Sequence, residues 1–160
     1  MKRLVVLLLV LPSIAWAQKQ FPPSLVSISG RISVIADTTS PYWKSLINTY
    51  IPRGVNKIAR YPIIAGSIDA PYKLVVKVVN ADTYISGISG NEHHANVKYR
   101  TRVEVEVNFL DMNNKIVWTW SGWADYSSAN RSMSKIAKML GQDMSKDGLL
   151  EPSYYTSTKQ

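Results

Sequence analysis

Residues 97–109, Val-Lys-Tyr-Arg-Thr-Arg-Val-Glu-Val-Glu-Val-Asn-Phe, decide the fold of this chain. Valine, tyrosine, threonine and phenylalanine hold the odd positions, while lysine, arginine, glutamate and asparagine hold the even ones. This period-two alternation predicts a long strand with one face in a core and the other in water. Asn113-Asn114 follows, and both residues tolerate the positive φ of a tight hairpin turn. The stretch therefore predicts an antiparallel hairpin.

A two-residue loop at Asn113-Asn114 sets the register of this hairpin. The register places Phe109 opposite Trp118, Val107 opposite Trp120, and Val105 opposite Gly122. It also places Glu104 opposite Trp123 on the outer face. A slip of one residue would move every apolar side chain to the wrong face, so we expect this pairing to be well specified.

The remaining apolar patterns predict three further strands and two helices. The strands cover residues 25–35, 61–64 and 72–79, with Tyr84 and Ile85 as an extension of the last. The first helix begins at Pro41 after the N-cap Ser40 and ends at Pro52 and Gly54. The second follows Ser127 or Ser128 and reaches Leu140, with Met144 one turn further. We expect an α+β two-layer sandwich: a mainly antiparallel sheet of four to five strands with two amphipathic helices on one face.

The N-terminal residues read as a secretory signal peptide. Lys2 and Arg3 precede an apolar run, and Ala15-Trp16-Ala17 provides the small residues of a cleavage site between Ala17 and Gln18. The alternative is an uncleaved anchor, but a membrane span needs about 20 apolar residues and this run has about half of them. The predicted organisation is a signal peptide (1–17), an extended leader (18–24), one α+β domain (25–148) and a flexible tail (149–160). No transmembrane segment is expected after cleavage, and the predicted location is periplasmic or secreted.

Charge and cysteine content narrow the class of partner. The formal net charge is +8, and removing Lys2 and Arg3 with the signal peptide lowers it by two, to +6. A positive surplus favours anionic partners, such as an anionic lipid or glycan, although it says nothing about fold. The chain has no cysteine, which favours a bacterial envelope protein over a small disulfide-rich secreted domain. Export argues against nucleic acid.

Catalytic motifs are absent from the sequence. It has no thiol, no Gly-x-Ser-x-Gly turn and no glycine-rich phosphate loop, so no catalytic residue and no cofactor are predicted. Glu104 and Glu106 share the outer strand face with Arg100 and Arg102, which indicates a charge-balanced solvent face rather than an acid–base pair. We therefore expect a protein that is not an enzyme.

Seven residues are candidate binding residues. They are Lys98, Arg100 and Arg102 on the outer strand face, the outward Trp123, and Glu92-His93-His94 in a polar loop predicted over residues 87–96. The outer face, joined by Lys73 and Lys77 of the neighbouring strand, could meet an anionic glycolipid, or could simply serve solubility. Adjacent histidines can reach one metal, but a zinc site needs three or four ligands, so no metal site is predicted. Long loops between rigid strands often contact partners.

The order of these elements resembles a loose group of bacterial envelope proteins. The group includes the curli-secretion lipoprotein (CsgG), the lipopolysaccharide-assembly lipoprotein (LptE) and the lipoprotein activators of penicillin-binding proteins. The resemblance covers most of residues 24–140 and is carried by Ile35-Ala36-Asp37, the helix from Pro41, residues 70–76, the strand 102–107, the return at 111–118 and the helix 127–140. This chain lacks the cysteine that carries the lipid in that group.

The resemblance implies a non-enzymatic accessory domain that packs against other envelope components. We therefore expect a periplasmic scaffold subunit of an envelope assembly or secretion machine, with envelope proteins or further copies of itself as partners. The alternative is an exported binding protein or inhibitor that recognises an anionic lipid or polysaccharide. A metal-dependent activity at Glu92-His93-His94 is a third and weaker hypothesis.

Overall fold

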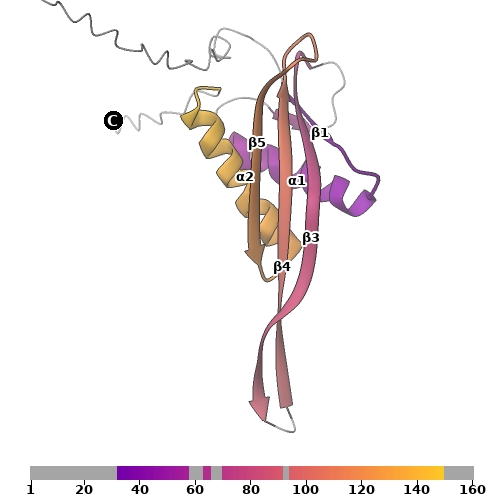
Figure 1. The fold of residues 1–160 in the computed structure, drawn as a ribbon, viewed down its shortest axis with the longest axis vertical. Coiled ribbons are helices and arrows are strands. Elements are labelled where there is room, and N and C mark those ends of the chain that lie inside the picture. Colours follow the sequence, from indigo (N-terminus) through magenta and orange to yellow (C-terminus); the bar gives the residue numbers. More distant parts are fainter. Residues whose placement is uncertain (1–31, 58–62, 66–69, 92–93, 150–160) are drawn as a thin grey trace, which may run out of the picture.

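The structure is a computed structural model that describes residues 32–57, 63–65, 70–91 and 94–149. Its sheet has five strands in the order β2-β1-β3-β4-β5. The elements in chain order are β1 (Ile32–Ala36), α1 (Pro41–Asn56), β2 (Ile63–Ala65), β3 (Tyr72–Asn91), β4 (His94–Leu110), β5 (Ile116–Tyr126) and α2 (Ala129–Lys146). β1 pairs in parallel with β2 and β3, and the two long hairpins β3–β4 and β4–β5 are antiparallel (Figure 1). The predicted α+β class is confirmed, with a mixed sheet.

One hydrophobic core joins the sheet to both helices. The odd-numbered residues from Val103 to Phe109 are buried, as the alternation of β4 predicts. They belong to the same cluster as Ile47 and Ile51 of α1 and Ile136 and Leu140 of α2. The helices also contact each other, and α2 contacts β4 and β5. That the helices form a second layer on one face stays a prediction, which this shared core supports.

The register of the β4–β5 hairpin agrees with the prediction. Phe109 pairs with Trp118, Val107 with Trp120, Val105 with Gly122 and Glu104 with Trp123. The two-residue loop was wrong, because the register shifts beyond Phe109 and leaves a five-residue loop, 111–115. The Asp111 carboxylate closes this loop by accepting hydrogen bonds from the backbone N–H groups of Asn113 (2.8 Å) and Lys115 (2.9 Å), and Asn114 has φ 59°.

The first helix is longer than predicted. α1 continues through Pro52 and Gly54 to Asn56. Pro52 removes one backbone donor, but the added turn buries Val55 completely in the core. Gly54 has a packing role rather than a terminating one, since a Cβ at this position would lie 2.4 Å from the Cβ of Ala137 in α2. Tertiary packing therefore overrides the local stop signals.

The predicted polar loop at residues 87–96 is a paired ribbon. β3 and β4 stay hydrogen-bonded as far as the pair Asn91 and His94, so only residues 92–93 separate the strands. Gly90 favours this close pairing: its φ is 127°, and a Cβ there would lie 1.9 Å from the carbonyl oxygen of His94. Register shifts at Val79 and Ser86 mark two bulges, which increase the twist of the ribbon.

Some sequence predictions fall outside the described residues. These are the signal peptide, the leader, the start of the first strand before Ile32, and residues 150–160 of the predicted tail. Leu149, the first residue of that predicted tail, is buried in the core. Within the described ranges, neither α1 nor α2 combines the length and apolar character that crossing a bilayer would require.

Candidate functional site

The hairpin β3–β4 projects beyond the rest of the domain as a two-stranded arm (Figure 1). β5 ends at Tyr126, which pairs with Thr101, and Thr101 pairs on its other side with Thr83. We call residues 84–91 and 94–100, which lie past this point, the arm. Two strands alone cannot bury an apolar face, so the arm presents both of its faces.

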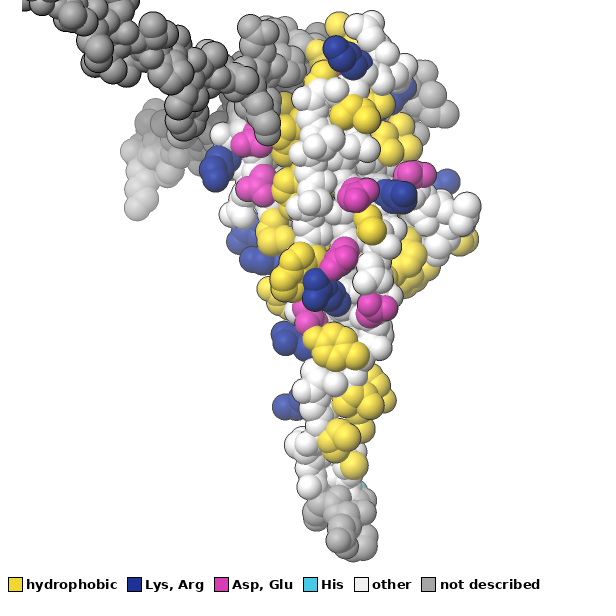
Figure 2. All heavy atoms as spheres, viewed as in Figure 1, with side chains coloured by type: hydrophobic (Ala, Val, Ile, Leu, Met, Phe, Trp, Pro, Cys, Tyr) yellow, Lys and Arg dark blue, Asp and Glu magenta, His cyan; other side chains and the backbone are white. Residues whose placement is uncertain are grey.

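The core-facing side of the sheet continues along the arm as an apolar face. Tyr99 and Val97 keep the odd parity of the buried β4 residues, and they pair with Ile85 and Ile88 of β3. Ile88 is 69% exposed and Ile85 is 54% exposed. Figure 2 shows hydrophobic side chains gathered along the arm. We call these four residues the apolar arm face; among the described residues, Ile85, Ile88 and Tyr99 are exposed and Val97 is half-buried.

The opposite face of the sheet carries charges of both signs. Arg102 donates to the Glu104 carboxylate from Nη2 (2.7 Å) and Nε (3.1 Å). Lys77 of β3 pairs with Glu106 of β4 in the register. The charge-balanced solvent face is thus confirmed for Arg102 and Glu104. Because Glu104 neutralises Arg102 and Glu106 lies opposite Lys77, this face has little unpaired positive charge.

Trp123 lies on this charged face, as the register predicts. It is 54% exposed, and the Arg102 guanidinium carbon lies 4.4 Å from its ring centroid. Such a cation–π contact at an exposed site is worth about 0.5–1 kcal/mol. Trp123, Arg102 and Glu104 therefore form one cluster that spans β4 and the edge strand β5.

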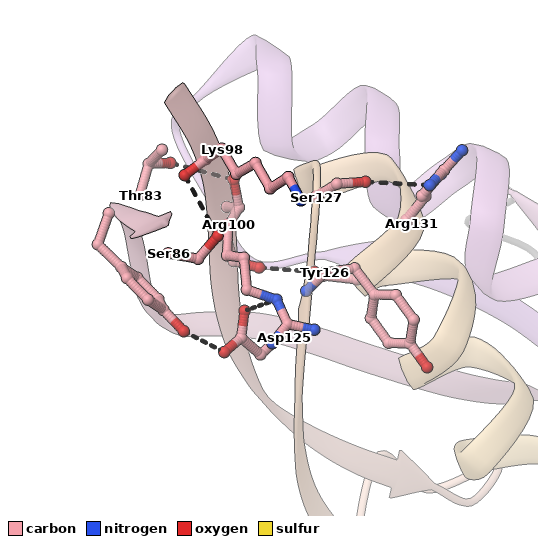
Figure 3. Close-up of polar contacts among 11 residues, drawn as sticks. Thr83, Ser86, Lys98, Arg100, Asp125, Tyr126, Ser127 and Arg131 are labelled. Carbon is pink, nitrogen blue, oxygen red and sulfur yellow. Dashed lines mark hydrogen bonds and ion pairs between the residues drawn. The ribbon is translucent and has the colours of Figure 1, made fainter. Parts of the chain in front are cut away.

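Arg100 belongs to a second polar group, at the base of the arm (Figure 3). Its Nε lies 3.6 Å from Oδ1 of Asp125, and the Tyr84 hydroxyl donates to the other carboxylate oxygen of Asp125. The hydrogen bond to Asp125 raises the pKa of Tyr84 above its usual 10.0, with desolvation and the Asp125 charge acting in the same direction. Arg100 and Arg102 oppose the shift.

The structure does not bring all seven candidate residues together. Lys98 and Arg100 lie at the base of the arm, Arg102 and Trp123 lie further along the sheet, and His94 is exposed near the arm tip. Glu92 and His93 lie outside the described residues. Among the residues that are described, no three metal-binding side chains form a group.

Sequence reasoning missed two features: the apolar arm face, and Arg131 of α2, which lines one surface hollow together with Lys98. Val97 and Tyr99 are part of the alternation of β4. Ile85 and Ile88, however, are separated by Ser86-Gly87 and followed by Ser89-Gly90, and glycine and serine favour a loop. Extending the alternation of β4 backwards, and pairing it with Ile85 and Ile88, would have found this face. Arg131 could not be placed beside Lys98 without the chain path from β5 into α2.

The comparisons with known proteins assign the chain to no family, and the three solved structures described below all have TM-scores under 0.5. No family model matches the chain, and no curated protein matches it either. A PelC dodecamer from Paraburkholderia phytofirmans has a TM-score of 0.48 and 16% identity over 76% of this chain and 87% of that chain. A chain described as a neuraminyllactose-binding hemagglutinin homolog from Helicobacter pylori has a TM-score of 0.41 and 10% identity, covering 79% and 88%. Lipoprotein GNA1162 from Neisseria meningitidis has a TM-score of 0.36 and 14% identity, covering 73% and 96%.

Proposed function

We propose that this chain is a non-enzymatic accessory or scaffold subunit of a bacterial envelope assembly or secretion machine. It is exported, cleaved after Ala17, and works in the periplasm or outside the cell through contacts with envelope proteins or further copies of itself. The observation that carries the proposal is the apolar arm face, which extends past the domain core and which no other described element covers.

Burial of the arm would supply a favourable free energy of association. Complete burial of an isoleucine side chain is worth about 1.5–3 kcal/mol, and Ile85 and Ile88 are both more than half exposed. Large apolar side chains gathered on a projecting element are typical of a protein contact surface. The arm also leaves backbone groups at both of its edges, where a further strand can pair.

The test compares one single variant on the arm with one in the loop between β4 and β5. Ile88→Lys places a charge on the apolar arm face, whereas Met112→Lys places the same charge on the 111–115 loop, where Met112 is 64% exposed. Light scattering after gel filtration, and crosslinking in intact cells, measure assembly. We expect the wild-type chain and Met112→Lys to form the same complex and Ile88→Lys to lose it. A wild-type chain that is monomeric and yields no crosslinked partner would contradict the proposal.

Export has its own test, independent of assembly. Mass spectrometry of the envelope fraction should find a mature chain that begins at Gln18. Recovery of the chain from the cytoplasm with Met1 intact would contradict the predicted signal peptide and the envelope role together.

A further inference from the structure

A hollow of about 630 Å³ lies at the base of the arm, where β4 continues past the end of β5. The chain leaves the sheet after Tyr126, turns at Ser127 and Ser128, and begins α2. Because β5 ends there, the edge of β4 is unpaired from Arg100 back toward His94. The first turn of α2 lies beside this unpaired edge. Lys98, Arg100, Ser127 and Arg131 line the hollow; Figure 3 shows Lys98 reaching toward Ser127, Arg131 on the far side of Ser127, and Arg100 turned toward Asp125.

The hollow carries an excess of positive charge. Lys98, Arg100 and Arg131 line it, and the carboxylate beside them, Asp125, is directed at Arg100. Within the described ranges, Lys98 and Arg131 form no ion pair. The first turn of α2 contains no acidic residue. Two cations are therefore left for a ligand, in contrast to Arg102, which Glu104 already engages.

Arg131 makes one local hydrogen bond through its side chain and one through its backbone. Its Nη1 donates to Ser127 Oγ (3.1 Å), and its backbone N–H donates to the Ser128 side chain that caps α2 (3.4 Å). The bond to Ser127 holds the exposed guanidinium beside the hollow, and the described residues leave most of its donors unused. Such a preordered planar group suits a carboxylate or phosphate, because it can donate two parallel hydrogen bonds.

The other walls of the hollow suit a sugar ring. Tyr99 and Tyr126, both exposed, add aromatic rings with hydroxyl groups, and Ser86 and Ser127 add further hydroxyls. Tyrosine offers an apolar face and a polar end at one site, and hydroxyls both donate and accept.

We propose that this hollow binds an acidic sugar, a pyranose ring that carries a carboxylate or a phosphate. Lys98 and Arg131 bind the anionic group, and Tyr99 and Tyr126 contact the ring. Two sources share this chemistry, a uronate polysaccharide and the phosphorylated sugar of a glycolipid. The site goes beyond the proposed contact of the arm with proteins, because it binds its ligand through the charges of Lys98 and Arg131; Tyr99 belongs to both surfaces.

The experiment measures binding of defined probes to the purified chain by calorimetry. The probes are an oligogalacturonate, a glucosamine phosphate, and a neutral maltooligosaccharide of matched length. Lys98→Gln/Arg131→Gln removes the two unpaired cations, and Lys135→Gln/Lys138→Gln removes the same charge from exposed positions of α2 outside the hollow. Circular dichroism establishes that both double variants fold.

We expect one or both acidic probes to bind and the neutral one not to bind. Lys98→Gln/Arg131→Gln should weaken binding about tenfold or more, while Lys135→Gln/Lys138→Gln should leave it unchanged. A preference for oligogalacturonate indicates a polysaccharide source, and a preference for the sugar phosphate indicates a glycolipid. Equal losses in the two double variants, equal binding of the neutral probe, or no binding of either acidic probe would overturn the proposal.

The two proposals fail separately. Ile88→Lys should leave binding of the acidic probe intact, and Lys98→Gln/Arg131→Gln should leave assembly intact. An acidic peptide that binds the hollow while both acidic sugars do not would overturn the sugar assignment and leave the role of the arm standing.

Discussion

The indole Nε1 of Trp120 donates a hydrogen bond to Oδ2 of Asp143, 2.8 Å away. One helical turn later, the same arrangement joins Trp118 to Asp147 at 2.9 Å. Alternate residues of β5 are thus hydrogen-bonded to Asp143 of α2 and to Asp147, the residue that follows its last turn, so the strand and helix periods coincide along this contact. Because Trp118 is almost completely buried, its N–H depends on Asp147 for a partner.

Removing these acceptors should destabilise the domain unequally. We expect Asp147→Ala to lower the free energy of unfolding by about 1–2 kcal/mol, since it leaves a buried indole donor unpaired. Asp143→Ala should cost less, because the Trp120 ring is only partly buried. Each substitution also removes a negative charge from the C-terminal end of α2, where the helix dipole disfavours it. The decrease in the free energy of unfolding is therefore smaller by a few tenths of a kcal/mol in both variants. Urea unfolding measures the change, with the exposed Gln142→Ala as control. Equal stability of all three variants would contradict this account.

A second prediction concerns the crossing of the two helices at Gly54. A Cβ at Gly54 would lie 2.4 Å from the Cβ of Ala137 and 2.7 Å from its backbone carbonyl carbon. The clash involves backbone, so the helices must separate, and Gly54→Ala should lower the free energy of unfolding by about 1–3 kcal/mol. Gly87→Ala is the matched control, since nothing lies within 4 Å of its added Cβ. Thermal unfolding distinguishes them: Gly54→Ala should melt lower, and a melting temperature equal to that of Gly87→Ala would refute the close approach.

The third prediction concerns the titration of Tyr84. Its hydrogen bond to Asp125 stabilises the neutral phenol, so its pKa lies above 10.0. The absorbance titration of wild type minus that of Tyr84→Phe should therefore have a midpoint above this value, and in an Asp125→Asn background the midpoint should fall. The hydrogen bond therefore stabilises the folded state fully when the pH is below the pKa of Tyr84 in the unfolded chain. This contribution is lost as the pH rises through the pKa of Tyr84 in the folded protein. A midpoint at or below 10.0 in the wild type would show that the Asp125 contact is not formed.

The sequence predicts the β4–β5 hairpin well for a physical reason. Its two faces differ strongly in polarity, and tryptophans lie opposite Phe109 and Val107, so each register other than the observed one exposes large apolar surface. The end of α1 and the length of β3 were predicted less well. Pro52, Gly54, Gly87 and Gly90 are local breakers, yet helix packing and strand pairing decide what they do.

The candidate site could be predicted only in part. The position of Trp123 and the pairing of Arg102 with Glu104 follow from the period of β4 and its register with β5. Arg131 lines the same hollow as Lys98 because the chain turns sharply between Tyr126 and the start of α2. No local sequence pattern predicts this turn. The apolar arm face was missed because Ile85 and Ile88 are three residues apart, a spacing that would put them on opposite faces of a regular strand. The bulge at Ser86 brings them to the same face.

The last prediction separates the arm from the core. Gly90 has φ 127°, and a Cβ there would lie 1.9 Å from the carbonyl oxygen of His94, so Gly90→Ala must distort the tip of the ribbon. The core is far along the hairpin and does not depend on this pair. We expect hydrogen exchange to become faster in residues 84–91 and 94–100, while the cooperative melting of the domain changes little. If the melting temperature falls as much as in Gly54→Ala, the arm and the core form one cooperative unit, and the view of the arm as a separate projecting element is wrong.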